Sequence, residues 1–222
     1  MEKLIVIEGL DGSGKATQTN LLTSFLVEKG MKVRQVSFPD YDSESSTLVK
    51  MYLAGEFGTH PDDVNAYAAS SFYAVDRFAS YKKNWESDFK NGIVVADRYT
   101  TSNAIHQCSK LDRDEWDSYL DWLFYYEYEL LGIPEPALVI YLRVDPDVSQ
   151  RLISVRYRGL EEKKDIHEKD LGYLRKCQIA ADYCSRRLKW KVVECCENDE
   201  MRSIDDIQSE VLALVEVIMK GE

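Results

Sequence analysis

The sequence predicts an α/β fold, in which a five-stranded parallel sheet carries helices on both faces. Short apolar runs alternate with segments of helical periodicity along the whole chain, as in parallel sheets with crossover helices. A glycine-rich loop joins the first apolar run to the first helix, where α/β proteins hold phosphate groups. We expect a single domain over residues 1–222 with a short mobile lid at about 156–168.

The predicted strands are short runs of mostly apolar residues. A strand of a parallel sheet is buried on both faces, so it reads as a nearly continuous hydrophobic stretch. Pro39 closes the second run, since proline lacks the N–H donor that a sheet needs. The five runs are 4–7, 33–39, 93–96, 137–142 and 191–195.

The predicted helices are segments whose apolar residues recur with a period near 3.6. The first follows the glycine loop and ends at Gly30, a residue favoured at helix C-termini. Pro61 is expected to open a long helix, because proline is well suited to the first helical position. The apolar positions of that helix are Val64, Tyr67, Ala68, Phe72, Val75, Phe78 and Ala79. The other helical segments are 45–53, 112–131 and those starting near 146, 169 and 203.

The composition is that of a soluble globular protein, with 222 residues, 45% hydrophobic and 30% charged. A net charge of −11 argues against a nucleic-acid polymer or a membrane as partner, since both require clustered Lys and Arg. No apolar run reaches the length of a membrane span, and we expect no signal peptide. The five cysteines include no C-x-x-C pair, which favours free thiols in the cytoplasm.

The loop after the first strand has the spacing G-x-x-x-x-G-K. Glycines allow several backbone N–H groups to point into one cavity, and the following helix N-terminus adds positive potential. Lys15 supplies a mobile charge for the β- and γ-phosphates of a nucleotide. Ala16 stands where a serine or threonine hydroxyl usually contacts Mg²⁺. The expected ATP-binding residues of the loop are Gly9, Leu10, Asp11, Gly12, Ser13, Gly14, Lys15, Ala16 and Thr17.

Polar residues follow two further strands at the same predicted edge of the sheet. The segment Phe38-Pro39-Asp40-Tyr41 lies at the end of the second strand, and Asp97-Arg98-Tyr99 lies at the end of the third. The carboxyl ends of parallel strands meet at one edge, where ligands of open α/β sheets bind. A buried run that ends in charged residues beside a phosphate loop therefore indicates an active site.

The chain resembles the thymidylate kinases, which belong to the P-loop nucleoside-monophosphate kinases. The resemblance rests on the order and spacing of several motifs over nearly the whole chain rather than on one motif. The first three are residues 7–15 (IEGLDGSGK), 38–39 (FP) and 72–77 (FYAVDR). The others are residues 97–107 (DRYTTSNAIHQ) and then Arg151, Arg156, Asp165 and Glu168.

The resemblance implies transfer of the γ-phosphoryl group of ATP to dTMP, with Mg²⁺ as cofactor. Arg98 would grip the acceptor phosphate, which suits a planar guanidinium. Tyr73 would stack on thymine while Arg77, one helical turn later, would hydrogen-bond the base edge. Phe38, Pro39 and Tyr41 would close around the acceptor, and the remaining candidates at this pocket are Asn103, His106 and Gln107.

Further roles implied by the resemblance concern the lid and the metal. The loop carries no arginine of its own, so the lid must provide one for the transition state. Arg156 is the first candidate and Arg151 and Arg158 the next, although a polar run of this kind is also typical of a solvated loop. With Ala16 after the lysine, Mg²⁺ would be held by phosphates, water and carboxylates. The candidate carboxylates are Asp11, Asp97, Asp165 and Glu168.

Two alternatives to a thymidylate kinase remain open at this point. One is a kinase for another monophosphate or for a nucleoside, in which Glu8 or Asp97 would act as the base. The other is a non-catalytic ATP-binding module, which the missing hydroxyl at Ala16 would permit. The family resemblance also implies a homodimer, and the aromatic segment 112–131 permits one.

Overall fold

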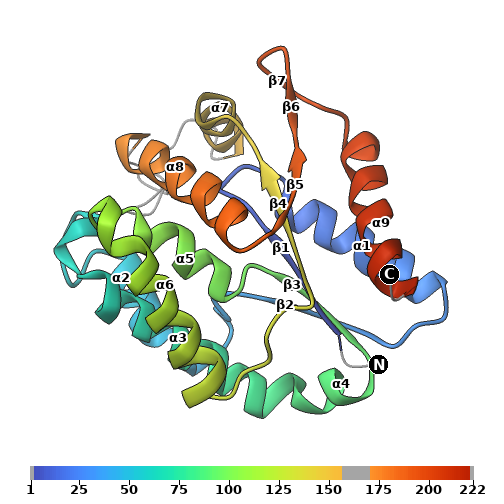
Figure 1. Ribbon diagram of the computed structural model, residues 1–222, viewed down its shortest axis with the longest axis horizontal. Helices are drawn as coiled ribbons and strands as arrows, with labels where there is room; N and C mark the ends of the chain where they lie inside the picture. The colour runs from blue at the N-terminus through green and yellow to red at the C-terminus, as the bar shows by residue number, and fades with distance from the viewer. Residues whose placement is uncertain (1–2, 157–170, 221–222) are drawn as a thin grey trace.

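The computed structural model describes residues 3–156 and 171–220, and it confirms the predicted α/β fold. Five parallel strands form one sheet in the order β2-β3-β1-β4-β5 (Figure 1). The strands are β1 (Lys3–Glu8), β2 (Val33–Ser37), β3 (Ile93–Asp97), β4 (Leu138–Arg143) and β5 (Lys191–Glu194). The carboxyl ends of β1, β2 and β3 are neighbours, so the three predicted polar clusters meet at one edge.

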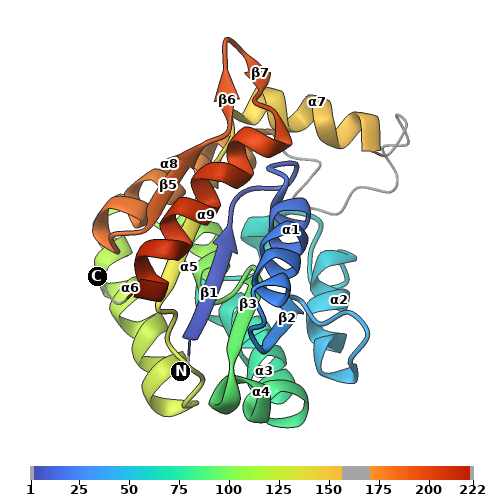
Figure 2. The ribbon, with the colours of Figure 1, turned by 90° about the vertical axis from the view of Figure 1, so that its right-hand side faces the viewer.

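The central strand β1 is buried on both faces, as its apolar run predicts. Ile5 and Ile7 pack against α1 (Lys15–Glu28) and α9 (Ile204–Lys220), while Leu4 and Val6 face the opposite layer. Figure 2 shows α1 and α9 together on one face of the sheet. Burial on both faces fixes β1, and with it the start of the glycine loop.

The opposite face carries most of the remaining helices (Figure 1). They are α2 (Thr47–Leu53), α3 (Ala66–Ser80), α4 (Glu86–Asn91), α5 (Thr100–Cys108), α6 (Trp116–Phe124) and α8 (Leu171–Arg187). The helix α7 (Pro146–Arg156) follows β4. Short 3₁₀ turns occur at 44–46, 61–63 and 113–115, and π-helical turns extend α3 at 81–85 and α6 at 125–130. A π-helical turn inside a helix is frequent at functional sites.

The prediction that Pro61 opens the long helix is wrong. Pro61–Asp63 forms an isolated 3₁₀ turn, and α3 begins only at Ala66. Asn65 caps this helix, because its side-chain oxygen accepts a hydrogen bond of 2.9 Å from the N–H of Ala68. A good N-cap side chain thus sets the start of the helix more strongly than the upstream proline.

The predicted apolar stripe of α3 is also wrong in part. Val75 is 48% exposed and Tyr67 41%, whereas Ser70 and Arg77 are buried on the inner face. This helix therefore turns polar side chains inward, where they form part of a site.

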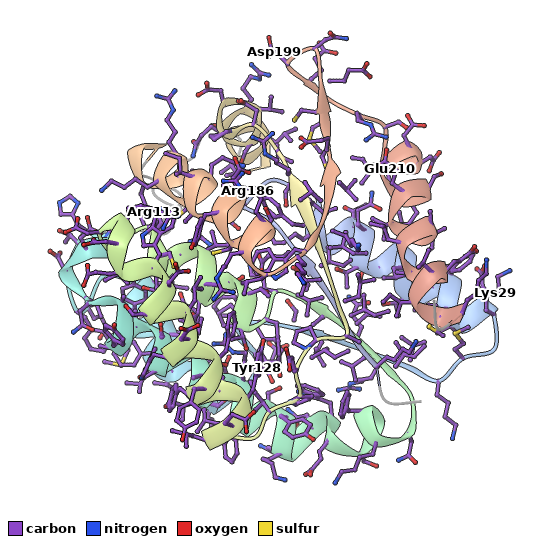
Figure 3. All side chains as sticks on the ribbon, viewed as in Figure 1. Lys29, Arg113, Tyr128, Arg186, Asp199 and Glu210 are labelled. Carbon is purple, nitrogen blue, oxygen red and sulfur yellow. The ribbon has the colours of Figure 1, made fainter. Side chains whose placement is uncertain are left out.

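The second and fifth strands end earlier than predicted, and a short hairpin was not predicted at all. The second strand ends at Ser37 and the fifth at Glu194. Beyond β5, β6 (Cys196–Glu197) pairs with β7 (Glu200–Met201) through a turn in which Asn198 and Asp199 have positive φ. Figure 3 labels Asp199 at the tip of this hairpin.

In the part of the chain that the structure describes, none of the helices is both long and apolar enough to cross a bilayer. The predicted lid overlaps the described chain only at Arg156, the last residue of α7. The rest of the lid lies outside the described residues.

Candidate active site

The glycine loop forms a tight turn between β1 and α1. Gly12 and Gly14 have φ values of 79° and 84°, a conformation that glycine adopts without steric cost. A side chain at residue 12 would meet the carbonyl oxygen of Ser149 at 2.9 Å, so the loop packs directly on α7. Gly14 is the N-cap of α1, and the first N–H groups of that helix therefore border the loop.

Lys15 folds back over this loop and is almost fully buried. Its ammonium group donates a hydrogen bond of 2.9 Å to the carbonyl oxygen of Leu10. Burial, followed by the nearby charge of Arg98, lowers the pKa of Lys15 to about 8. This positive charge is therefore costly in the structure unless an anion accompanies it.

Arg98 links the loop to the end of β3. Its Nη2 lies 2.5 Å from a carboxylate oxygen of Asp11, and its Nη1 donates to the carbonyl oxygen of Gly9 at 3.4 Å. Burial acts to lower the pKa of Arg98, but the carboxylates of Asp11 and Glu8 outweigh it and raise that pKa. For Asp11, burial acts to raise the pKa, while Arg98 and Lys15 hold it well below its usual range. Both groups are thus charged at neutral pH.

The backbone of Arg98 has a φ of 66°, which is uncommon for a residue other than glycine. Its N–H donates to the carbonyl oxygen of Ile7 at 3.1 Å, which ties the turn after β3 to β1. Strained conformations of this kind persist where the surroundings over-determine them and often mark functional sites.

Glu8 holds the glycine loop and the start of α5 together. Its carboxylate is fully buried and accepts hydrogen bonds from the N–H of Gly9 and from the hydroxyl groups of Thr101 and Ser102, at 2.6–3.0 Å. Arg98 lies 3.7 Å away. Glu8 lines neither of the two cavities described below, so its chemistry here is to hold the glycine loop against α5.

The predicted acceptor residues surround one cavity of about 90 Å³. The aromatic Tyr73 and Tyr99 contribute to its walls, with Leu53 and Ser102 as lining residues that the sequence did not indicate. The predicted residues that line it are Phe38, Pro39, Tyr41, Tyr73, Arg77, Arg98, Asn103, His106 and Gln107. The structure therefore brings together all nine residues that were expected to contact the acceptor.

Tyr73 and His106 are each oriented by other aromatic rings. The ring of Tyr52 lies edge-on to that of Tyr73, with centroids 6.4 Å apart. The imidazole of His106 stacks on Tyr173 of α8 at 6.0 Å, and its Nδ1 lies 3.2 Å from the hydroxyl oxygen of Tyr173. Helix α8 thus positions His106 in the acceptor cavity.

Arg77 has a partner that sequence reasoning missed. Its Nε and Nη2 donate to the two carboxylate oxygens of Glu127 at 2.7 and 2.5 Å, and both side chains are buried. Burial acts to lower the pKa of Arg77, but the Glu127 carboxylate outweighs it and raises that pKa. The signal in the sequence was a single carboxylate among the aromatic residues 122–128.

A second cavity, of about 700 Å³, opens beside the glycine loop. The loop residues Asp11–Thr17 line it, and so does Asp97. Both cavities are bordered by Asp11, Arg98, Phe38, Pro39 and Tyr41. The larger cavity has room for a triphosphate, and the shared lining residues place the two cavities side by side.

Some predicted ATP-binding residues lie outside this second cavity. Gly9 packs against Ser13, and the side chain of Leu10 is buried in the core. Arg151 is exposed and donates to the carbonyl oxygen of Asp199 in the hairpin. Sequence reasoning missed Met201, Arg202 and Ile204, which line the cavity after the unpredicted hairpin.

The structure describes only some of the residues predicted to bind the metal or to form the lid. Asp11 is paired with Arg98, and Asp97 lines the larger cavity. Among the described residues, no group of three or more His, Cys, Asp or Glu side chains could hold a metal ion. Arg158, Asp165 and Glu168 lie outside the described residues, and for Arg156 only the backbone in α7 is described.

Comparisons with known proteins show similarity over nearly the whole chain. A probable thymidylate kinase of Pyrococcus horikoshii is 30% identical over 219 residues, covering 98% of this chain and 97% of that protein. The thymidylate kinase of Schizosaccharomyces pombe is 28% identical over 216 residues, covering 96% and 91%. A solved thymidylate kinase from Candida albicans matches the fold with a TM-score of 0.69 and 19% identity, covering 99% of this chain and 93% of that one.

The family model described as thymidylate kinase matches residues 7–211. That range begins in β1, includes the glycine loop and both cavities, and ends within α9. On the strength of this match, the chain belongs to the thymidylate kinase family.

Proposed function

We propose that this protein transfers the γ-phosphoryl group of ATP to dTMP, which yields dTDP and ADP. The observation that carries the proposal is the position of Arg98, whose guanidinium borders both cavities and contacts the glycine loop. Phosphoryl transfer between two nucleotides depends chiefly on positioning and on stabilising negative charge. A cation that borders both cavities can position the two nucleotides and stabilise their negative charge.

On the ATP side, the N–H groups of the loop and of the first turn of α1 hold the phosphates. Lys15 is close to the same phosphates, and their charge compensates the burial that lowers its pKa. Met201 and Ile204 line the same cavity and provide apolar surface.

On the acceptor side, Arg98 grips the monophosphate and Tyr73 stacks on the base. Arg77 and Asn103 contact the base edge from α3 and α5. Gln107 is fully buried, and neither its amide nitrogen nor its amide oxygen has a hydrogen-bond partner among the described residues. A buried amide without partners is costly, so it favours a ligand that offers both a donor and an acceptor. We place His106 beside the sugar.

Mg²⁺ fits this site as an ion held mainly by phosphates and water. Among the described candidates, Asp97 lines the nucleotide cavity and is the carboxylate best placed to bind the ion, whereas Asp11 is engaged by Arg98. Ala16 lines the same cavity but offers no side-chain oxygen as a ligand. The ion, when bound, would neutralise charge on the β- and γ-phosphates. In the transition state we assign the lid charge to Arg156, with Arg151 and Arg158 as the other candidates.

The geometry counts against the nucleoside kinase alternative. Such an enzyme needs a carboxylate base beside the acceptor hydroxyl. Glu8 borders neither cavity, and its carboxylate oxygens accept hydrogen bonds from the loop and from α5. Asp97, the other candidate base, lines only the larger cavity beside the glycine loop and not the acceptor cavity. A non-catalytic ATP module, in turn, would have no use for a second cavity that shares Arg98.

The direct test is ADP formation in a coupled assay with ATP, Mg²⁺ and a panel of acceptors: dTMP, dUMP, dCMP, dGMP and AMP. We expect dTMP to support turnover far better than dCMP, dGMP and AMP. Equal rates across the panel would refute the assignment of the base and leave the kinase class intact. Absence of ADP formation with every acceptor would refute the kinase itself.

The homodimer and the cytoplasmic location stay predictions. The exposed apolar side chains Val75, Tyr125 and Leu130 lie on α3 and on the π-helical turn after α6. Burying them against a second copy would remove apolar surface from water. Light scattering on the purified protein measures the mass in solution, and a monomeric mass would contradict the dimer.

A further inference from the structure

A buried carboxylate, Glu127, contacts Arg77 and Asn103, the two residues proposed to contact the base. Glu127 belongs to the π-helical turn 125–130, directly before Tyr128, which Figure 3 labels. Glu127 has no exposed surface and does not line the cavity. It accepts hydrogen bonds from Arg77 on α3 and from Thr100 and Asn103 on α5. One side chain thus contacts two of the residues that face the acceptor.

The contact with Arg77 fixes the orientation of its guanidinium. Glu127 takes the Nε and Nη2 edge in a two-pronged pair. The opposite nitrogen, Nη1, makes one long hydrogen bond of 3.4 Å to the carbonyl oxygen of Tyr99. An arginine has five N–H groups, so donors remain on a side chain that borders the cavity. Arg77 therefore presents a donor to the base.

The contact with Asn103 fixes which end of its amide faces the cavity. The nitrogen Nδ2 donates to the carbonyl oxygen of Ser70 at 3.2 Å and to Glu127 at 3.3 Å. Both partners only accept hydrogen bonds, so the NH₂ group must lie on their side. The amide oxygen has no donor among the described residues, and Asn103 lines the cavity. Asn103 therefore presents an acceptor to the base.

We propose that Glu127 is a positioning residue that makes the acceptor site selective for pyrimidines with a 4-oxo group and an N3–H. This inference rests on the proposed function. A donor beside an acceptor matches the O4 and N3–H of thymine or uracil. Cytosine carries an amino group at C4 and an unprotonated N3, so it places donor against donor and acceptor against acceptor. The carboxylate sets this polarity without touching the substrate.

The test is the substitution Glu127→Gln, with kcat and KM measured for dTMP, dUMP and dCMP. Glutamine offers one acceptor oxygen where the carboxylate offers two, so Arg77 or Asn103 must turn. We expect kcat/KM for dTMP and dUMP to fall together by about 10-fold or more, chiefly through KM. The kcat/KM for dCMP should fall less or rise. The ratio of kcat/KM for dTMP to kcat/KM for dCMP should therefore decrease by about the same factor. KM for ATP should not change.

The matched control is Thr100→Val. It removes the hydroxyl bond to Glu127 but leaves the bonds to Arg77 and Asn103, so the thermal stability should fall while the dTMP-to-dCMP ratio stays constant. If Glu127→Gln lowers the rates for all three pyrimidines in parallel, or leaves the ratio unchanged, the inference is wrong and Glu127 is only structural.

A second variant covers the case in which Glu127→Gln does not fold. Glu127→Asp keeps the charge but is one methylene shorter, so it cannot reach both Arg77 and Asn103 at their present distances. The ratio of kcat/KM for dTMP to that for dCMP should decrease in this variant too. An unchanged ratio would overturn the inference. If the wild-type protein fails to phosphorylate dTMP at all, the proposed function fails instead, and the two outcomes are distinguishable.

Discussion

The two halves of the site, the glycine loop and the acceptor cavity, use different parts of the chain, the first the backbone and the second side chains. The glycine loop binds through main-chain N–H groups, whose direction follows from Gly12, Gly14 and the start of α1. The acceptor wall consists of side chains from α3, α5 and the segment after β2, and a buried ion pair supports it from behind. A site made of backbone depends on local conformation. A site made of side chains depends on partners far away in the sequence, such as Glu127, which lies 50 residues from Arg77.

The largest effect is expected where the two halves meet. Arg98→Ala removes the cation that borders both cavities, and it should cost about 3–4 kcal/mol of transition-state stabilisation, or roughly 10²–10³-fold in kcat. Steady-state kinetics with dTMP and ATP measure the loss. Arg98→Lys keeps a charge without the planar fork and should recover only part of the rate. If Arg98→Ala has a rate near that of the wild type, Arg98 does not take part in the reaction.

The backbone half can be tested with two alanine substitutions in the same loop. Gly12→Ala combines a φ of 79° with a contact of 2.9 Å to the carbonyl oxygen of Ser149. Gly14→Ala meets no atom within 4 Å and carries only the cost of a φ of 84°. The strain at either residue is on the order of 1–3 kcal/mol, to which Gly12→Ala adds the clash.

Calorimetric titration with ATP and the melting temperature measure both variants of the loop. We expect the weaker ATP binding and the lower melting temperature in Gly12→Ala. Equal losses in the two variants would mean that the packing of the loop on α7 has no influence.

The side-chain half can be tested at the stacking ring. Tyr73→Ala should raise the KM for dTMP by about 10- to 100-fold, because stacking of a base on an aromatic ring contributes about 1–3 kcal/mol. KM for ATP should stay constant, since Tyr73 lines only the acceptor cavity. Tyr73→Phe keeps the ring and is the control. A parallel rise of both KM values would mean that the substitution disturbs the whole fold rather than the stack.

The smallest expected effect is a pH dependence of stability that comes from Lys15. Burial lowers the pKa of Lys15 to about 8 in the folded protein from its ordinary value of 10.5. Between these values the unfolded chain binds more protons, so this group makes the free energy of unfolding rise as the pH rises from about 8 to 10.5. Below pH 8 its destabilising contribution is complete.

Denaturant unfolding of the wild type and of Lys15→Met at several pH values isolates this contribution. The difference in unfolding free energy, wild type minus variant, should increase across that range. A constant difference would show that the pKa of Lys15 is not lowered.

The sequence predicts most of the fold because its strands are short, apolar and buried on both faces. Ile93–Ala96 and Leu4–Ile7 are of this kind, and each was placed within about a residue of the observed strand. The loop was equally predictable, since glycine spacing and the following lysine are local features. The start of α3 was not, because Pro61 and Asn65 compete as helix starts and the side-chain cap of Asn65 decides the outcome.

What the sequence could not provide is the pairing of distant polar residues. Nothing local connects Glu127 with Arg77 or Glu8 with Thr101, because folding of α3, α5 and the π-helical turn brings them together. The hairpin β6–β7 was missed for another reason. Its strands have two residues each, too few to display a period, and so the nearby cavity residues Met201 and Arg202 gave no signal.

The ion pair between Arg98 and Asp11 has a consequence for which anions can enter. Asp11 is tethered within reach of the guanidinium, so its effective concentration there far exceeds that of a freely diffusing ion. An anion that binds at the Nη2 end of the guanidinium must displace this internal competitor. Chloride or a lone carboxylate gains too little from doing so, whereas a doubly charged phosphate that is also held by its base can succeed. The pair with Asp11 therefore favours phosphate over small anions at that end of the guanidinium.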